Sequence, residues 1–307
     1  MRPRDRQQAQ TIDGALTLHH VAVRALPGIG PATLRAVFID QVFDSIHRVE
    51  YARRLVGMTL GANRSDPNVA EFDPLKAAVL QHRQGNVEEA CWLVFLFVHF
   101  GRDRSGGWGY VRSVFGRLGT GQPWDWASVS ANLATFRAWL AANMDALKSR
   151  GAGFGNHRKY MSLDAYAPAG TGAAVDTYVG WVLDGKGHAA LLADALDSVG
   201  GDPKAAFDVL YRSMQRVAGF GRTARFDYLT MLGKLGIAGI EPGRAYLTGA
   251  TGPVKGANLL FGGTNKPSTL DDWLVELDAS LGIGMQVLED ALCNWQKSPG
   301  RYVAFRG

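Results

Sequence analysis

Three Gly-x-Gly segments of this chain combine the residue types that hold a phosphate. The first is part of the sequence LPGIG, the second precedes two arginines, and the third precedes a polar run. Glycine permits a tight turn, and the helix that follows offers backbone N–H groups to a phosphate oxygen. One such segment more often marks only a helix C-cap, but three in a basic chain favour helix–hairpin–helix elements that bind DNA. The residues expected to contact DNA are Gly28, Gly30, Gly219, Gly221, Arg222, Thr223, Arg225 and Lys255.

Two aspartates follow these turns at spacings that suit cleavage of a glycosidic bond. That reaction passes through an oxocarbenium-like state, which a nearby carboxylate stabilises, or it uses a carboxylate to activate water. Asp227 lies one helical turn after Thr223 on the same face. Asp176 follows Gly155 by twenty-one residues. We predict Asp227 as the catalytic carboxylate and Asp176 as the alternative, although a helix cap or a surface ion pair would explain either residue.

Two polar runs have side chains suited to a base edge, a sugar hydroxyl or a phosphate. One follows Gly155, and the other is a helical stripe near the C-terminus that contains Glu289, Cys293 and Lys297. A solvated loop and a core helix with a polar edge would produce the same patterns. The residues predicted to line a base pocket or its rim are Asn156, His157, Arg158, Lys159, Tyr160, Glu289, Asn294 and Lys297.

Apolar residues at three- and four-residue steps predict a mainly α-helical fold that positions these side chains. The segment 87–99 reads as a buried central helix, with Asn86 as its N-cap and two glutamates in its first turn. We expect a flexible polar leader over residues 1–18 and one compact, bilobal helical unit over residues 19–307. The other helical patterns lie at 31–58, 128–148, 174–184, 188–199, 203–217, 222–235 and 270–297.

Composition and missing motifs exclude several classes of protein. Lys and Arg number 33 against 28 Asp and Glu, so the formal net charge is +5, and the 307-residue chain has 47% hydrophobic residues. Two distant cysteines rule out a disulfide scaffold and a cysteine-rich metal site. Phosphate-loop, dinucleotide-binding, zinc-protease and serine-hydrolase motifs are absent. We expect a cytoplasmic protein with no metal, no cofactor, no membrane segment and no obligate protein partner, and with DNA as its partner.

Several blocks of sequence together resemble the alpha-glutamyl/putrescinyl thymine pyrophosphorylase family, and most closely its third clade. The blocks run in order over roughly residues 35–307, and the combination is more specific than any one of them. They are Glu88–Leu96 with His99–Gly101, Phe154–Tyr160, Phe220–Tyr228, Thr251–Pro253 with Gly256–Ala257, and Leu288–Lys297.

The resemblance implies a fold related to the helix–hairpin–helix DNA glycosylases and a base in DNA as the substrate. Phage members are associated with hypermodified thymine, made when an amine displaces pyrophosphate from an activated 5-hydroxymethyl group. Bacterial members are linked to antiphage glycosylases that remove bulky modified bases. Both activities need DNA held by its phosphates and a base turned out of the stack.

We expect a DNA glycosylase that flips and excises a modified pyrimidine, such as glucosylated 5-hydroxymethylcytosine, from phage DNA in antiviral defence. Bifunctional glycosylases of this superfamily usually carry a Schiff-base lysine two residues after the second glycine. Here that position holds His157 or Thr223, which favours a monofunctional enzyme that leaves an abasic site, although Lys159 keeps a lyase step open. The alternatives are a transferase that displaces pyrophosphate from activated 5-hydroxymethyluracil with an amine, and an inert DNA-binding module.

Overall fold

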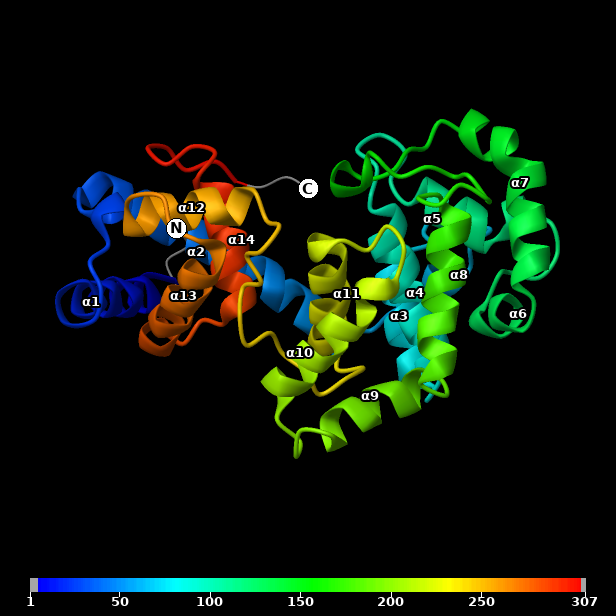
Figure 1. Ribbon diagram of the computed structural model, residues 1–307. Coiled ribbons are helices and arrows are strands. Elements are labelled where there is room, and N and C mark those ends of the chain that lie inside the picture. Colours follow the sequence, from blue (N-terminus) through cyan, green and yellow to red (C-terminus); the bar gives the residue numbers. More distant parts are fainter. Residues whose placement is uncertain (1–4, 305–307) are drawn as a thin grey trace. The chain divides into compact units, whose positions relative to one another are not determined.

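The computed structural model consists mainly of helices (Figure 1). It describes residues 5–304, apart from the side chain of Asn156. Within that range there are fourteen α-helices and no strand, and isolated bridges join Asp103 to Gly107 and Ser162 to Gly170. The prediction of a mainly α-helical fold is therefore confirmed.

Contacts between Cα atoms group the chain into two compact units, whereas the sequence predicts one unit over residues 19–307. Unit 1 combines the residues up to Ala52 with those from Pro242 onward, and unit 2 comprises Arg53–Glu241. Helix α2 (Ala32–Leu55) begins in unit 1 and ends in unit 2. The other helices of unit 1 are α1 (Arg6–Ala22), α12 (Gly252–Phe261), α13 (Pro267–Leu281) and α14 (Met285–Trp295).

Unit 2 is organised around α4 (Val87–Phe100), which contacts α3, α5, α6, α9 and α11 (Figure 1). Asn86 caps this helix by accepting a hydrogen bond from the Glu89 N–H, as predicted, and eleven of its fourteen residues are buried. The other helices of unit 2 are α3 (Pro74–Arg83), α5 (Gly109–Phe115), α6 (Trp126–Ala131), α7 (Leu133–Ser149), α8 (Thr171–Asp184), α9 (His188–Asp197), α10 (Pro203–Ser213) and α11 (Arg222–Lys234).

Residues 6–18, which the sequence places in a flexible leader, lie in helix α1. Ala9, Ile12 and Leu16 share one face of this helix and are buried in the core of unit 1. Their spacing of three and four residues is the helical one. The sequence does not predict this helix, because its three buried apolar side chains lie among many polar residues.

Glycines let the helices of unit 1 approach closely. A Cβ atom on Gly28, in the 3₁₀ turn Pro27–Ile29, would lie 2.0 Å from the Leu259 carbonyl oxygen of α12. A Cβ on Gly256 would lie 2.4 Å from the Leu292 carbonyl oxygen of α14. Both obstacles are backbone atoms, so the helices would have to separate to admit a side chain.

We predict that Gly256→Ala lowers the free energy of unfolding by roughly 1–3 kcal/mol, because the added methyl overpacks the contact between α12 and α14. The matched control is Gly14→Ala, since nothing lies within 4 Å of a Cβ at Gly14 in α1. That control should gain about 0.5–1 kcal/mol from helix propensity. Urea unfolding of both variants measures the difference, and equal stabilities would contradict the close approach.

Candidate functional site

The second Gly-x-Gly segment forms the turn that leads into α11. Gly219 has a φ of +72°, and a Cβ there would lie 2.6 Å from the Met161 Cε atom. Gly221 is the N-cap of α11, and the preceding Ala218 N–H donates to the Thr177 Oγ1 atom at 2.8 Å. The turn thus lies against the connection between α7 and α8. That connection contains the third Gly-x-Gly segment.

The two arginines after this turn pack on aromatic rings. Arg222 is 8% exposed and lies 4.8 Å above the centre of the Phe226 ring. Arg225 lies 4.3 Å above the Tyr211 ring and donates to the Tyr211 carbonyl oxygen at 3.1 Å. Thr223, between them, is partly exposed. Arg225 thus joins the first turns of α11 to Tyr211 of α10, whereas Arg222 packs along α11 itself.

Asp227 and Arg158, two residues that the sequence assigns to the site, form an ion pair. The Arg158 Nη2 and Asp227 Oδ2 atoms are 3.3 Å apart, and the side chains are 10% and 42% exposed, respectively. Arg158 also donates from Nε to the Val98 carbonyl oxygen at 2.8 Å, near the end of α4. Burial lowers the pKa of Arg158, and the charge of Asp227 acts in the opposite direction. A nearly buried cation therefore holds a solvent-accessible carboxylate in place.

Two glycines allow Arg158 to reach α4. Gly155 donates its N–H to the Phe100 carbonyl oxygen at 2.8 Å, and a Cβ on Gly155 would lie 2.9 Å from the Gly101 Cα atom. Gly101 itself has a φ of +64°. Gly155 of the third segment thus serves backbone packing, which places the following 3₁₀ turn, Asn156–Arg158, against the end of α4.

His99, which is buried in the last turn of α4, is held as a neutral imidazole. Its Nε2 atom lies 3.0 Å from Thr171 Oγ1, which donates its own proton to the Ser162 carbonyl oxygen, so Nε2 carries the ring proton. Burial, with the charge of Arg158 as a second cause, lowers the pKa of His99 to about 3. The ring is parallel to those of Phe95 and Phe220.

Asp176, the alternative catalytic residue, has a different partner. Its carboxylate pairs with Arg137 at 2.9 Å on α7, and Arg137 also donates to the Ala165 carbonyl oxygen. This contact fastens α8 to α7 and to the connection between them. In the polar run after Gly155, His157, Lys159 and Tyr160 face solvent, and the side chain of Asn156 lies outside the described residues.

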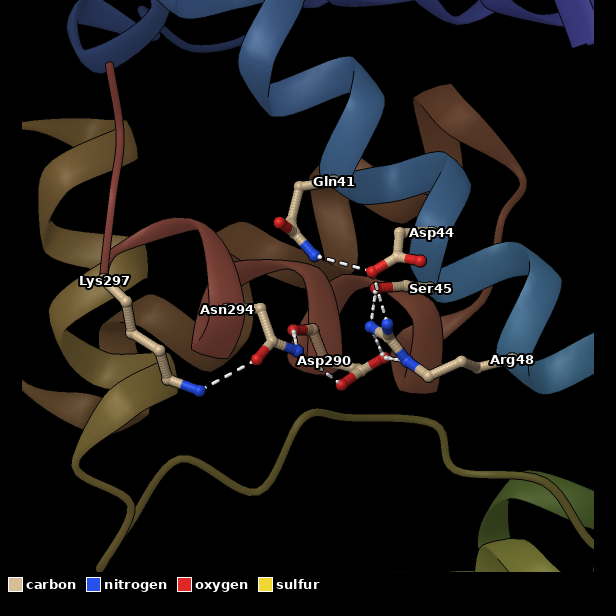
Figure 2. A network of polar contacts seen from close by, with 7 residues as sticks. All are labelled: Gln41, Asp44, Ser45, Arg48, Asp290, Asn294 and Lys297. Atoms are coloured by element: carbon tan, nitrogen blue, oxygen red, sulfur yellow. Dashed lines mark hydrogen bonds and ion pairs between the residues drawn. The ribbon is translucent and has the colours of Figure 1, made fainter. Parts of the chain in front are cut away.

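The C-terminal residues of the predicted pocket belong to a polar network in unit 1 (Figure 2). Lys297 donates to the Asn294 Oδ1 atom at 2.8 Å, and Asn294 donates to the Asp290 Oδ1 atom at 2.9 Å. Asp290 accepts from Arg48 on α2 at 2.5 Å, and Arg48 also pairs with Asp44 at 2.5 Å. The network connects α2 to α14. Sequence reasoning missed Arg48 and Asp290, although the Asp44–Arg48 spacing of four residues was a readable signal.

The remaining predicted residues also lie in unit 1. Lys255 is exposed on α12, Glu289 is partly exposed on α14, and Gly30 ends the turn that contains Gly28. These residues and the Arg158–Asp227 pair belong to different units.

A buried hydrogen-bonded chain, also missed from the sequence, connects four helices of unit 2. The Glu88 carboxylate lies 2.6 Å from His188 Nδ1, and His188 Nε2 lies 2.7 Å from the Tyr178 hydroxyl. The Tyr178 hydroxyl lies 2.9 Å from the Tyr228 hydroxyl on α11. Burial lowers the pKa of His188, so its neutral ring donates to Glu88 and accepts from Tyr178. The chain thus ends on the residue beside Asp227.

Neither a membrane segment nor a metal cluster is found in the described part of the chain. No helix there has the length and apolar character needed to cross a membrane. The described residues also contain no group of three or more His, Cys, Asp or Glu side chains placed to hold a metal ion.

Comparison of the sequence with protein-family models identifies the family to which the chain belongs. The model of alpha-glutamyl/putrescinyl thymine pyrophosphorylase clade 3 matches residues 33–307. The chain therefore belongs to this family, whose description denotes enzymes of DNA base modification. Searches of curated proteins and of solved structures gave no match for this chain.

We predict opposite pH effects for the neighbouring glutamates of α4. Hydrogen bonds from His188 and Ala189 outweigh burial and lower the pKa of Glu88 to about 2, whereas burial raises the pKa of Glu89 to about 7. Glu88 therefore contributes stability above pH 4.5 that is lost as the pH falls towards about 2. Glu89 costs stability as the pH rises from 4.5 to about 7, because its carboxyl is easier to ionise in the unfolded chain.

The variants Glu88→Gln and Glu89→Gln separate the two effects. In thermal unfolding across this pH range, the stability of Glu89→Gln relative to the wild type should increase as the pH rises. Glu88→Gln should lose less stability than the wild type in acid. The same pH profile for both variants would refute the assignment.

Arg48 supports a prediction for unit 1. We expect Arg48→Met to lower the free energy of unfolding by about 1–3 kcal/mol, because it leaves two partly buried carboxylates next to each other. The control is Arg244→Met, whose ion pair with Asp272 is more than half exposed on both sides and should contribute about 1 kcal/mol or less. Denaturant unfolding at low and high salt compares the two variants. An equal loss of stability in both would contradict a structural role of Arg48 in joining α2 to α14.

Proposed function

We propose that this enzyme excises a bulky modified pyrimidine, such as glucosylated 5-hydroxymethylcytosine, from phage DNA and leaves an abasic site. Antiviral defence is the biological role that we infer from this activity. The observation that supports the proposal is the Arg158–Asp227 pair: a carboxylate open to solvent and anchored by a nearly buried guanidinium. Family membership supports a DNA base as the target.

The proposed chemistry uses Asp227 as an ionised group. As a glycosidic bond breaks, positive charge develops on the sugar, and a fixed carboxylate stabilises it or orients the attacking water. Arg158 acts as a positioning residue, because its contact with the Val98 carbonyl limits where the guanidinium can hold Asp227. No Schiff-base lysine is needed, which agrees with the His157 and Thr223 side chains at the positions considered for it.

Two arginines of unit 2 that could face a pyrophosphate are engaged within the fold, which weakens the transferase alternative, although Lys159 is exposed. Displacement of pyrophosphate needs several cations turned towards the leaving group. In unit 2, Arg158 is engaged by Asp227 and Val98, and Arg222 is packed on Phe226. The family description nevertheless names a pyrophosphorylase, so transfer of an amine to an activated thymine-type base is the second candidate.

One assay separates these functions. The purified protein is incubated with DNAs that carry cytosine, hydroxymethylcytosine, glucosylated hydroxymethylcytosine or modified thymines, and abasic sites and released bases are measured by mass spectrometry. Base release from one modified DNA supports the glycosylase. A change of base mass with pyrophosphorylated hydroxymethyluracil DNA and an amine supports the transferase, and binding without either reaction supports an inert DNA-binding module.

We predict that Asp227→Asn retains DNA affinity and lowers excision by about a hundredfold or more, because the amide keeps the shape but not the charge. Asp176→Asn is the matched control and should excise normally, since it alters only the contact with Arg137. Single-turnover excision and binding anisotropy are measured for both. Normal excision by Asp227→Asn would transfer the catalytic role to Asp176.

A further inference from the structure

Tyr160 is exposed to an unusual degree for this molecule. It is 90% exposed, whereas Tyr110, Tyr178, Tyr211 and Tyr228 of the same unit are each 8% exposed or less. An aromatic ring left in water forgoes the burial that stabilises the others. The four buried rings pack in the helical core, and Tyr160 extends from the connection between α7 and α8.

The backbone of Tyr160 is tied to the Arg158–Asp227 pair. Tyr160 follows Arg158 by two residues, so their Cα atoms are no more than about 7 Å apart. The next residue, Met161, donates its N–H to the Arg158 carbonyl oxygen at 2.8 Å. Because Arg158 is held by Val98 and Asp227, the segment that carries the exposed ring is anchored at the candidate catalytic carboxylate.

One cation lies against this ring, and a second exposed cation adjoins the glycine that packs near Arg158. The Lys159 Nζ atom lies 5.0 Å from the centre of the Tyr160 ring, and the Lys159 side chain is exposed. Arg102 is also exposed, and it adjoins Gly101, whose added Cβ would lie 3.6 Å from the Arg158 Cγ atom. A solvent-facing aromatic ring with a basic side chain beside it is a combination with which proteins bind unpaired bases and their phosphates.

We propose that Tyr160 stacks on a DNA base next to the target nucleotide, while Lys159 and Arg102 contact the flanking phosphates. This assignment rests on the proposed function, because it takes DNA as the substrate. It changes the role of Tyr160 from a pocket residue to a residue that stabilises the gap left when a base is turned out of the stack. A protein partner would also accept an exposed tyrosine, but the adjacent cations favour a polyanion.

The test compares Tyr160→Ala with Tyr160→Phe by fluorescence anisotropy on labelled single- and double-stranded oligonucleotides. Alanine removes the ring and should weaken binding about tenfold, whereas phenylalanine preserves stacking and should bind like the wild type. The salt dependence should be unchanged in Tyr160→Ala and reduced by about one ion in Lys159→Ala. Tyr51→Ala, at a tyrosine of α2 that is 56% exposed, is the control and should bind normally.

A second readout reports stacking directly. A 2-aminopurine next to the modified base should change its fluorescence when the wild type or Tyr160→Phe binds, and not when Tyr160→Ala binds. Equal affinities and equal fluorescence for all variants would overturn the stacking role, even if excision is observed. Dependence of DNA binding on Tyr160 without release of any base would support stacking and refute the glycosylase, and a wild type that does not bind DNA would refute both.

Discussion

The guanidinium of Arg158 is the interaction on which the candidate site depends. It connects the end of α4, through the Val98 carbonyl, to the Asp227 carboxylate on α11. Burying a cation is costly unless its donors find acceptors, and here a backbone carbonyl and a carboxylate supply them. The close contact of Gly101 with Gly155 is therefore required, because a side chain at either glycine would move the segment that carries Arg158.

A second set of polar contacts also fixes the position of α11, through Tyr228, the residue next to Asp227. Tyr228 is connected through Tyr178 and His188 to Glu88 at the start of α4. Helix α11 is thus tied to both ends of α4, by Arg158 near its C-terminus and by the Glu88 chain at its N-terminus. Such networks are stable only when every member is satisfied, which constrains how far α11 can shift.

The two units use polar contacts in different ways. In unit 1, Arg48 and the hydrogen bonds from Asp290 to Lys297 join α2 to α14 (Figure 2), beside a core of apolar side chains and closely packed glycines. In unit 2, Asp227 and Asp176 both pair with an arginine and keep access to solvent, but the arginine that holds Asp227 is the more buried one and is also bound to α4. This difference is the reason for placing the proposed chemistry at Asp227 and treating Asn294 and Lys297 as parts of a structural clamp.

The sequence by itself determined the helical class, the buried character of α4 with its Asn86 cap, and the family. Apolar periodicity and capping act over a few residues, so they are legible in a linear chain. It did not predict helix α1 over residues 6–22, and it joined α13 to α14 across Gly282 and Gly284, which have positive φ angles. It also passed over α3 and α12, whose short apolar faces gave weaker signals.

Only the tertiary structure decided which polar residues act together. Asp227 and Arg158 are 69 residues apart and Glu88 and His188 are 100 apart, so no local pattern pairs them. Asp176, the alternative catalytic residue, likewise pairs with Arg137, which is 39 residues away in the sequence. Spacing along a chain predicts which side chains share a helical face, whereas the packing of separate helices determines which faces meet.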